Sequence, residues 1–280
     1  MPEGDSVFRL AARLRPALDG RVLAAGELRV PQHARADLAG RAVLGHETHG
    51  KHLLQRFSGG LTLHTHLRLD GSWTVTRPGR SVPARVRPDV RVRLATAAGP
   101  TAWGISLPIV QLLETRDEAE AVGFLGPDPL RDDWDEAEAV RRVSSDPARP
   151  VLEAIRDQRN LAGLGNLWVN EVCFLRGVHP DEPVGRVEVA PLVRLAARAL
   201  RHSATTPDAY QVTTGDRRRG EQHWVVGRAS RPCKRCGTLV VGRGEHPPRT
   251  ASTPPSASPR YRLGGPTGRT YWCPRCQPLR

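Results

Sequence analysis

Hydrophobic residues at the start of the chain recur with the spacing of an amphipathic helix. The positions that follow this spacing are Val7, Leu10, Leu14 and Leu18. Residues three and four apart lie on one face of a helix, so the pattern predicts a helix over residues 5–18 with one buried face. Asp5 stands at the first position and is expected to cap the helix.

Between residues 21 and 121 the pattern changes to short runs in which hydrophobic and polar residues alternate. Gly and Pro separate these runs, as expected for strands joined by turns. The clearest runs are 42–44, 53–57, 61–69, 73–75 and 90–94. This succession of short strands and turns predicts a β-sandwich or β-barrel as the first domain.

The run over residues 61–69 has two distinct faces, because side chains alternate along a strand. One face holds Leu61, Leu63, Leu67 and Leu69, and the other holds His64, His66 and Arg68. A metal site at His64 and His66 lacks an obvious third ligand. We therefore expect the polar face to line a basic groove.

A second region follows the sequence Gly126-Pro127-Asp128-Pro129, which interrupts any regular element. Helical patterns then cover residues 133–143, 150–155, 167–175 and 191–202. The chain as a whole is predicted to be α+β, with the strands first and the helices after them.

A glycine-rich turn connects two of these helices. It reads Leu161-Ala162-Gly163-Leu164-Gly165 and leads into Asn166. Backbone amides at such a turn and at the following helix N-terminus are suited to binding a phosphate. An ordinary packing motif, in which the glycines only permit close approach, explains the turn equally well.

The composition points to a polyanionic partner. The 280 residues include 42 Lys and Arg and 29 Asp and Glu, which gives a net charge of +13 and a pI near 10.9. Almost every cation is Arg, and only Lys51 and Lys234 are lysines. A retained lysine at position 51 suggests a need for a primary amine or a compact ammonium group. Nucleic acid is the partner that this charge favours.

No apolar run is long enough to span a bilayer, and the acidic start of the chain does not resemble a secretory signal. We therefore expect a cytoplasmic protein without a membrane partner.

Four cysteines near the end of the chain predict a structural zinc site. They form two Cys-x-x-Cys pairs, Cys233 with Cys236 and Cys273 with Cys276. Two such pairs can supply four thiolates to one tetrahedral Zn²⁺ per chain. Redox motifs or disulfides are the alternative. The segment 242–268 between the pairs is rich in Pro, Ser, Gly and Arg and is expected to be a mobile insertion.

Several short sequences, taken together and in order, resemble the formamidopyrimidine-DNA glycosylase/endonuclease VIII family of DNA repair enzymes. They are Pro2-Glu3-Gly4, Gly50-Lys51, His66-Leu67-Arg68-Leu69-Asp70-Gly71, Leu125-Gly126-Pro127-Asp128-Pro129-Leu130, Ala162-Gly163-Leu164-Gly165-Asn166, Asn170-Glu171, Pro232-Cys233 and Tyr271-Trp272-Cys273-Pro274-Arg275-Cys276-Gln277. The resemblance implies a catalytic β-sandwich domain over residues 1–128 and a helix–two-turn–helix domain over 129–205. A zinc β-hairpin over 206–280 completes the implied organisation.

The resemblance also implies roles for individual residues. Removal of Met1 would expose the amine of Pro2, the family's nucleophile, beside Glu3, which would move protons. Lys51 matches a lysine that contacts the lesion phosphate, and Asn166 and Arg269 match phosphate-binding residues. Leu69 aligns with a residue that fills the gap left by a flipped nucleotide, although an ordinary core leucine would fit the same pattern.

The chain departs from the family pattern at several points. Ser6 replaces a glutamate found in many relatives, and Arg269 stands four residues before Cys273 where five is usual. The two cysteine pairs are 36 residues apart, longer than the family's compact hairpin. The arginine-phenylalanine loop that inserts opposite 8-oxoguanine is missing near Trp103, which favours the endonuclease VIII branch.

The resemblance therefore predicts a monomeric glycosylase/lyase that acts on oxidised or abasic double-stranded DNA, with oxidised pyrimidines as the expected lesions. An enzyme that prefers oxidised purines and a non-catalytic DNA-damage-binding protein remain alternatives. A zinc-ribbon transcription factor does not account for the long β domain.

Overall fold

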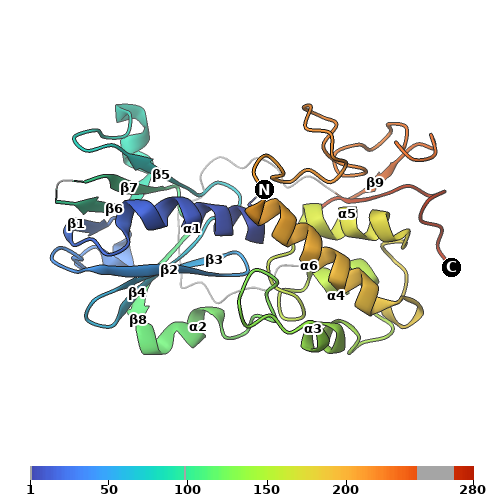
Figure 1. Ribbon diagram of the computed structural model, residues 1–280, viewed down its shortest axis with the longest axis horizontal. Helices are drawn as coiled ribbons and strands as arrows, with labels where there is room; N and C mark the ends of the chain where they lie inside the picture. The colour runs from blue at the N-terminus through green and yellow to red at the C-terminus, as the bar shows by residue number, and fades with distance from the viewer. Residues whose placement is uncertain (1, 98, 245–267) are drawn as a thin grey trace.

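The computed structural model describes residues 2–97, 99–244 and 268–280 (Figure 1). Helix α1 (Gly4–Leu18) precedes two four-stranded antiparallel sheets. One sheet has the strand order β1-β6-β7-β5 and the other has the order β2-β3-β4-β8. The strands are β1 (Leu23–Leu28), β2 (Val43–His49), β3 (His52–Phe57), β4 (Leu61–His66), β5 (Ser72–Thr76), β6 (Val90–Thr96), β7 (Thr101–Ile105) and β8 (Ile109–Glu114).

The first hydrophobic core lies between these sheets and includes the apolar face of α1. Val7, Leu10, Leu14 and Leu18 are all buried in it, together with Phe57 and residues of both sheets. The spacing of the leucines therefore predicted the correct face of the helix, and the β-sandwich prediction is confirmed. The prediction that Asp5 caps α1 was wrong, because Glu3 occupies the N-cap and Asp5 is buried inside the helix.

The prediction for the strand over residues 61–69 was also partly wrong. β4 ends at His66, and Arg68 adopts a left-handed backbone conformation with φ of 46°. The polar face is not an open groove, since His64 is buried and its Nε2 lies 2.8 Å from Nδ1 of His52. The short helix α2 (Glu118–Val122) supplies Glu118, which accepts a hydrogen bond from Thr62 on this face at 2.6 Å.

The second half of the chain forms a helical domain with its own core. Its helices are α3 (Glu136–Val143), α4 (Val151–Arg156), α5 (Asn166–Arg176) and α6 (Val189–Thr205). Figure 1 shows α1 lying along the sandwich, with its N-terminal end beside α5 and α6. Four short 3₁₀ helices complete the helical elements of the described ranges, and they are η1 (Pro31–His33), η2 (Ala84–Asp89), η3 (Thr115–Asp117) and η4 (Val184–Arg186).

A two-stranded hairpin closes the chain, formed by β9 (Val241–Arg243) and β10 (Thr270–Trp272). Its core contains Val225, Val240 and Tyr271 and continues into the helical domain through Phe174 of α5. The predicted insertion over 242–268 begins within β9, and its residues 245–267 lie outside the described residues.

Across residues 2–97, 99–244 and 268–280, no helix has both the length and the apolar character needed to cross a membrane.

Candidate active site

The carboxylate of Glu3 lies at the N-terminus of α5, although 162 residues separate it from the N-cap of that helix, Gly165. The side chain is fully buried and accepts hydrogen bonds from the backbone N–H groups of Gly165 and Leu167, each at 2.8 Å. A longer contact of 3.4 Å reaches the N–H of Trp168. The helix N-terminus, which carries partial positive charge, therefore fixes the orientation of this carboxylate.

Lys51 is the cation whose charge has the largest effect on the pKa of Glu3. Burial raises the pKa of Glu3, and the charge of Lys51 opposes that shift most strongly. Burial likewise lowers the pKa of Lys51, while the charges of Glu3 and Asp5 partly restore it. The pKa values of Glu3 and Lys51 are thereby shifted toward neutral pH, which suits groups that give and take protons.

The turn between β2 and β3 places Lys51 in this site. Gly50 has a φ of 56°, a conformation that side chains rarely adopt, and its N–H donates to Asp128 Oδ2 at 2.7 Å. Asp128 Oδ1 accepts a second bond from the N–H of Leu130 at 2.8 Å. Burial raises the pKa of Asp128, and these two amides oppose the shift. The aspartate therefore anchors the Lys51 turn to the segment that joins the two domains.

Gly165 must lack a side chain for Glu3 and Lys51 both to lie against it. A Cβ atom at this position would lie 2.6 Å from Glu3 Oε1 and 2.7 Å from Lys51 Nζ. Real Cβ atoms essentially never approach another heavy atom closer than 3.0 Å, so the two functional groups occupy the space that any larger residue would need. The glycine-rich turn thus does more than permit helix packing.

Asp5 connects α1 to both neighbouring helices. Its Oδ2 accepts hydrogen bonds from the indole N–H of Trp168 in α5 at 3.2 Å and from the Ser203 hydroxyl in α6 at 2.6 Å. Beside it, the Oγ of Ser6 accepts the backbone N–H of Glu3 at 3.1 Å. Ser6 therefore helps to hold the N-terminus, although it cannot replace the missing glutamate chemically.

Two further predicted residues lie at the edges of this arrangement. Pro2 directly precedes Glu3 and is partly exposed. Leu69 lies in the turn after β4 and is 53% exposed, whereas Leu67 is buried in the first core. Leu69 is thus not a core leucine, and its proposed contact with DNA stays a prediction.

Asn166 and Arg269 come together although they lie far apart in the sequence. The Nδ2 of Asn166, the first residue of α5, donates to the carbonyl of Arg269 at 3.1 Å. One turn later in α5, the Asn170 Oδ1 accepts the N–H of Tyr271 in β10 at 2.7 Å. Helix α5 therefore carries Glu3 at its N-terminus and holds the C-terminal hairpin along its side.

Glu171 is a functional residue whose role sequence reasoning missed. This buried carboxylate accepts the N–H groups of Trp224, Val225 and Val226 at 2.8–2.9 Å, as well as the hydroxyl of Thr213. It organises the long segment that leads from α6 to the cysteines. The roles of Asp128 and Gly165 were overlooked in the same way, although both lie within the motifs quoted above, and Asp5 was assigned only a capping role.

The four cysteines form one cluster, with every pair of Sγ atoms within 4.8 Å. Sγ atoms of Cys233 and Cys276 are 4.0 Å apart, and those of Cys236 and Cys273 are 3.4 Å apart. Sulfurs of a disulfide lie about 2.05 Å apart. Sulfurs around a tetrahedral metal with bonds of about 2.3 Å lie roughly 3.8 Å apart, which matches this cluster. The four cysteines can therefore bind a metal.

Comparisons with known proteins agree with this arrangement. The chain is 46% identical to a protein named "Probable endonuclease 8 2" from Streptomyces coelicolor, over 99% of this chain and 94% of that protein. It is 39% identical to "DNA-(apurinic or apyrimidinic site) lyase Nei2" from Mycolicibacterium smegmatis, over 99% of both chains. Family models for the N-terminal and H2TH domains of formamidopyrimidine-DNA glycosylase match residues 1–103 and 125–203.

The chain belongs to the formamidopyrimidine-DNA glycosylase/endonuclease VIII family. Within this family it lies on the endonuclease VIII-like branch, since the relatives with 46% and 39% identity include proteins named "Probable endonuclease 8 2" and "Endonuclease 8 2", whereas its identity to a formamidopyrimidine-DNA glycosylase from Moorella thermoacetica is 30%, over 85% of this chain.

Solved structures share the fold of this family member. A formamidopyrimidine-DNA glycosylase of Lactococcus lactis, in complex with DNA containing N7-benzyl-Fapy-dG, has a TM-score of 0.74 at 19% identity, covering 99% of this chain and 100% of that chain. The Thermus thermophilus glycosylase has a TM-score of 0.72 at 24% identity, with 100% of both chains covered.

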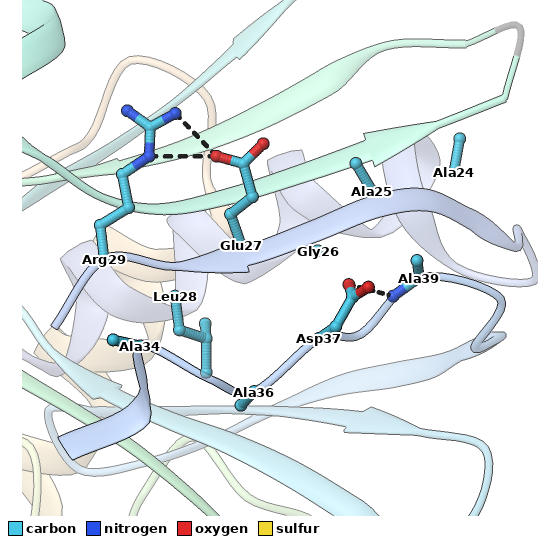
Figure 2. Close-up of a pocket in the computed structure, with 10 residues that line it drawn as sticks. All are labelled: Ala24, Ala25, Gly26, Glu27, Leu28, Arg29, Ala34, Ala36, Asp37 and Ala39. Atoms are coloured by element: carbon cyan, nitrogen blue, oxygen red, sulfur yellow. Dashed lines mark hydrogen bonds and ion pairs between the residues drawn. The ribbon is translucent and has the colours of Figure 1, made fainter. Parts of the chain in front are cut away.

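A groove on the β-sandwich of this family member is separate from the site around Glu3. Figure 2 shows it between β1 and the segment after η1, where small side chains line most of it. Its charged groups are already engaged, because Arg29 pairs with Glu27 at 2.7 Å and Asp37 accepts the N–H of Ala39 at 2.9 Å. We assign this groove no function.

Proposed function

We propose that this chain is a bifunctional DNA glycosylase/AP lyase of base excision repair, which removes oxidised bases and then cleaves the strand at the abasic site. The observation that carries the proposal is the convergence of Glu3 and Lys51 on Gly165, beside Pro2 and at the N-terminus of α5. A buried carboxylate and the amine of a partly exposed lysine, with opposed pKa shifts, next to a secondary amine, form a set suited to covalent acid–base catalysis.

The proposed reaction begins at the amine of Pro2. Its lone pair attacks C1′ of the damaged nucleotide, the bond from C1′ to the base breaks, and the base leaves with a proton. Glu3 is placed to move the protons of this step. The Pro2 nitrogen then loses its proton, and the C1′–O4′ bond of the sugar opens as O4′ takes up a proton, which leaves an iminium between Pro2 and C1′. This iminium acidifies C2′–H. Loss of that proton drives out the 3′ phosphate, and a second elimination, assisted by Lys51, releases the 5′ phosphate.

The DNA would be held by groups around this centre. We propose that Lys51 contacts the phosphate of the lesion and that Asn166 and Arg269 bind neighbouring phosphates. The link between Asn166 and Arg269 supports this proposal, because it joins the helix and the hairpin that would supply the two contacts. Leu69 would occupy the gap that the flipped nucleotide leaves in the duplex.

We propose Zn²⁺ as the metal of the cysteine cluster, with one ion per chain. All four ligands would come from the protein, so the ion would hold the hairpin in place and take no part in the reaction. Elemental analysis of the purified protein measures this directly, and a different metal or a substoichiometric content would contradict it.

Oxidised pyrimidines are the proposed lesions. The similarity to proteins named endonuclease 8 supports this choice, as does the missing loop near Trp103. Such an enzyme would act as a monomer in the cytoplasm, on the DNA of the nucleoid. A non-catalytic damage-binding protein is the second candidate, but it would have no need of Pro2, Glu3 and Lys51 together.

Excision on a panel of lesion duplexes tests this proposal. Duplexes carrying an oxidised pyrimidine, an oxidised purine or an abasic site are incubated with the protein, and released base and strand cleavage are measured separately. We expect release of oxidised pyrimidines and cleavage with phosphate at both ends of the gap. Binding without release or cleavage on any duplex would favour the damage-binding protein instead.

A further inference from the structure

An arginine-rich segment follows β5 and extends into the start of β6 at the edge of the sandwich. We call residues 77–93 the arginine arm. It contains six arginines and one acidic residue, Asp89, so it carries a net charge of +5 out of +13 for the whole chain. Four of its arginines are exposed and have no ion-pair partner among the described residues, and they are Arg77, Arg80, Arg85 and Arg87.

The arm is folded and has a small core of its own. Val82 and Val90 are buried against Trp103 of β7, and Val86 packs beside them. The Thr76 hydroxyl donates to the carbonyl of Arg80 at 2.9 Å, which closes the turn at the start of the arm. Because the backbone is held in this way, its exposed arginines would lose less conformational entropy on binding a partner than those of a flexible tail.

The position of the arm relates it to the proposed DNA site. β5 begins three residues after Leu69 and runs for five residues, about 17 Å at the usual strand rise, before the arm starts. In Figure 1 the arm, with η2, projects on the same side of α1 as β9 and the segment after α6, whereas α2 and α3 lie on the opposite side. Arg269, the proposed phosphate contact of the hairpin, directly precedes β10, which pairs with β9.

We propose that β5 follows the axis of the bound duplex and that the arginine arm binds the phosphate backbone of that duplex about five base pairs from the lesion, given a rise of about 3.4 Å per base pair. This inference rests on the proposed function, since it takes Leu69 to mark the position of the lesion. Guanidinium groups bind phosphate oxygens through paired N–H donors. The arm thereby extends the DNA contact beyond the nucleotides that the catalytic site itself holds.

Binding of duplexes of two lengths tests the arm. The variant carries Arg80→Ser, Arg85→Ser and Arg87→Ser, and the DNA contains a central abasic-site analogue in a duplex of about 25 base pairs or a hairpin-closed duplex of about nine. We expect about tenfold weaker binding of the long duplex at moderate salt, and a salt dependence reduced by roughly 0.9 for each lost contact. The short duplex should bind as it does to the unaltered protein.

A matched control removes the same charge elsewhere. Arg116, Arg141 and Arg194 are exposed arginines that each form an ion pair with a glutamate, so their triple replacement by Ser lowers the net charge equally. Equal weakening by this control, equal weakening on both duplexes, or no weakening at all would overturn the proposal. A failure of the proposed function would instead be seen as a lack of excision by the unaltered protein.

Discussion

Glu3→Gln is expected to slow base excision by a factor of about 10²–10⁴, the usual contribution of a positioned general acid or base. The amide has nearly the same shape as the carboxyl group but cannot exchange a proton. It also places an NH₂ group where one of the N–H donors of Gly165 and Leu167 now finds an acceptor. Single-turnover excision of an oxidised pyrimidine, compared with binding of an abasic-site analogue, measures the effect.

The result should be a loss of rate that exceeds the loss of binding, because a proton-transferring group acts in the transition state. Glu27→Gln is a suitable control, since Glu27 is a half-exposed carboxylate in the β-sandwich that pairs with Arg29 and Arg93. Excision by Glu3→Gln at the rate of this control would remove Glu3 from the mechanism. A parallel fall in rate and binding would reduce Glu3 to a structural residue.

Gly165→Ala is expected to reduce excision by about 10²-fold or more, the effect of displacing catalytic groups by about 1 Å. The new methyl group would need the space that Glu3 Oε1 and Lys51 Nζ occupy, so at least one of them must move. The backbone of Gly165 is extended, with φ of −126°, so alanine itself introduces no backbone strain there. Steady-state excision and thermal unfolding of the same preparation measure the two consequences.

Gly45→Ala provides the matched control for this substitution. Gly45 lies in β2, and nothing lies within 4 Å of the position that its Cβ would take. We expect this control to keep its activity. A Gly165→Ala variant that is as active as the Gly45→Ala variant would mean that the present positions of Glu3 and Lys51 beside Gly165 are not needed for catalysis.

Regular elements with one buried face were well predicted from the sequence. The leucine spacing of α1 and the apolar stripe of α6 each gave a helix within a few residues of its observed bounds, because a single face decides their burial. β4 was predicted too long, since the turn at Arg68 depends on a left-handed conformation that the alternating pattern does not encode. His64 was predicted to line an open groove, because helix α2, which lies against this face of β4, comes from a distant segment of the chain.

The site itself followed from the resemblance to a family and could not be obtained from periodicity. Pro2 and Glu3 are unremarkable in their local sequence, Lys51 is marked only by the scarcity of lysine, and only the fold brings Glu3 to Gly165. The supporting contacts also join residues that lie far apart in the sequence, such as the hydrogen bond from Gly50 to Asp128 across 78 positions. Local patterns carry no information about such pairs, so the supporting residues were missing from the prediction.

Borohydride trapping with a free and a blocked N-terminus tests the central claim most directly. Borohydride reduces the iminium between an amine and abasic DNA to a stable crosslink, so it reports which amine reacts. Protein that begins at Pro2 is compared with protein that keeps an N-terminal extension, and binding of an abasic-site analogue is measured for both. The account predicts that both proteins bind but only the one with a free Pro2 amine forms the crosslink. Undiminished crosslinking by the blocked protein would contradict it and assign the covalent chemistry to Lys51 or to another amine.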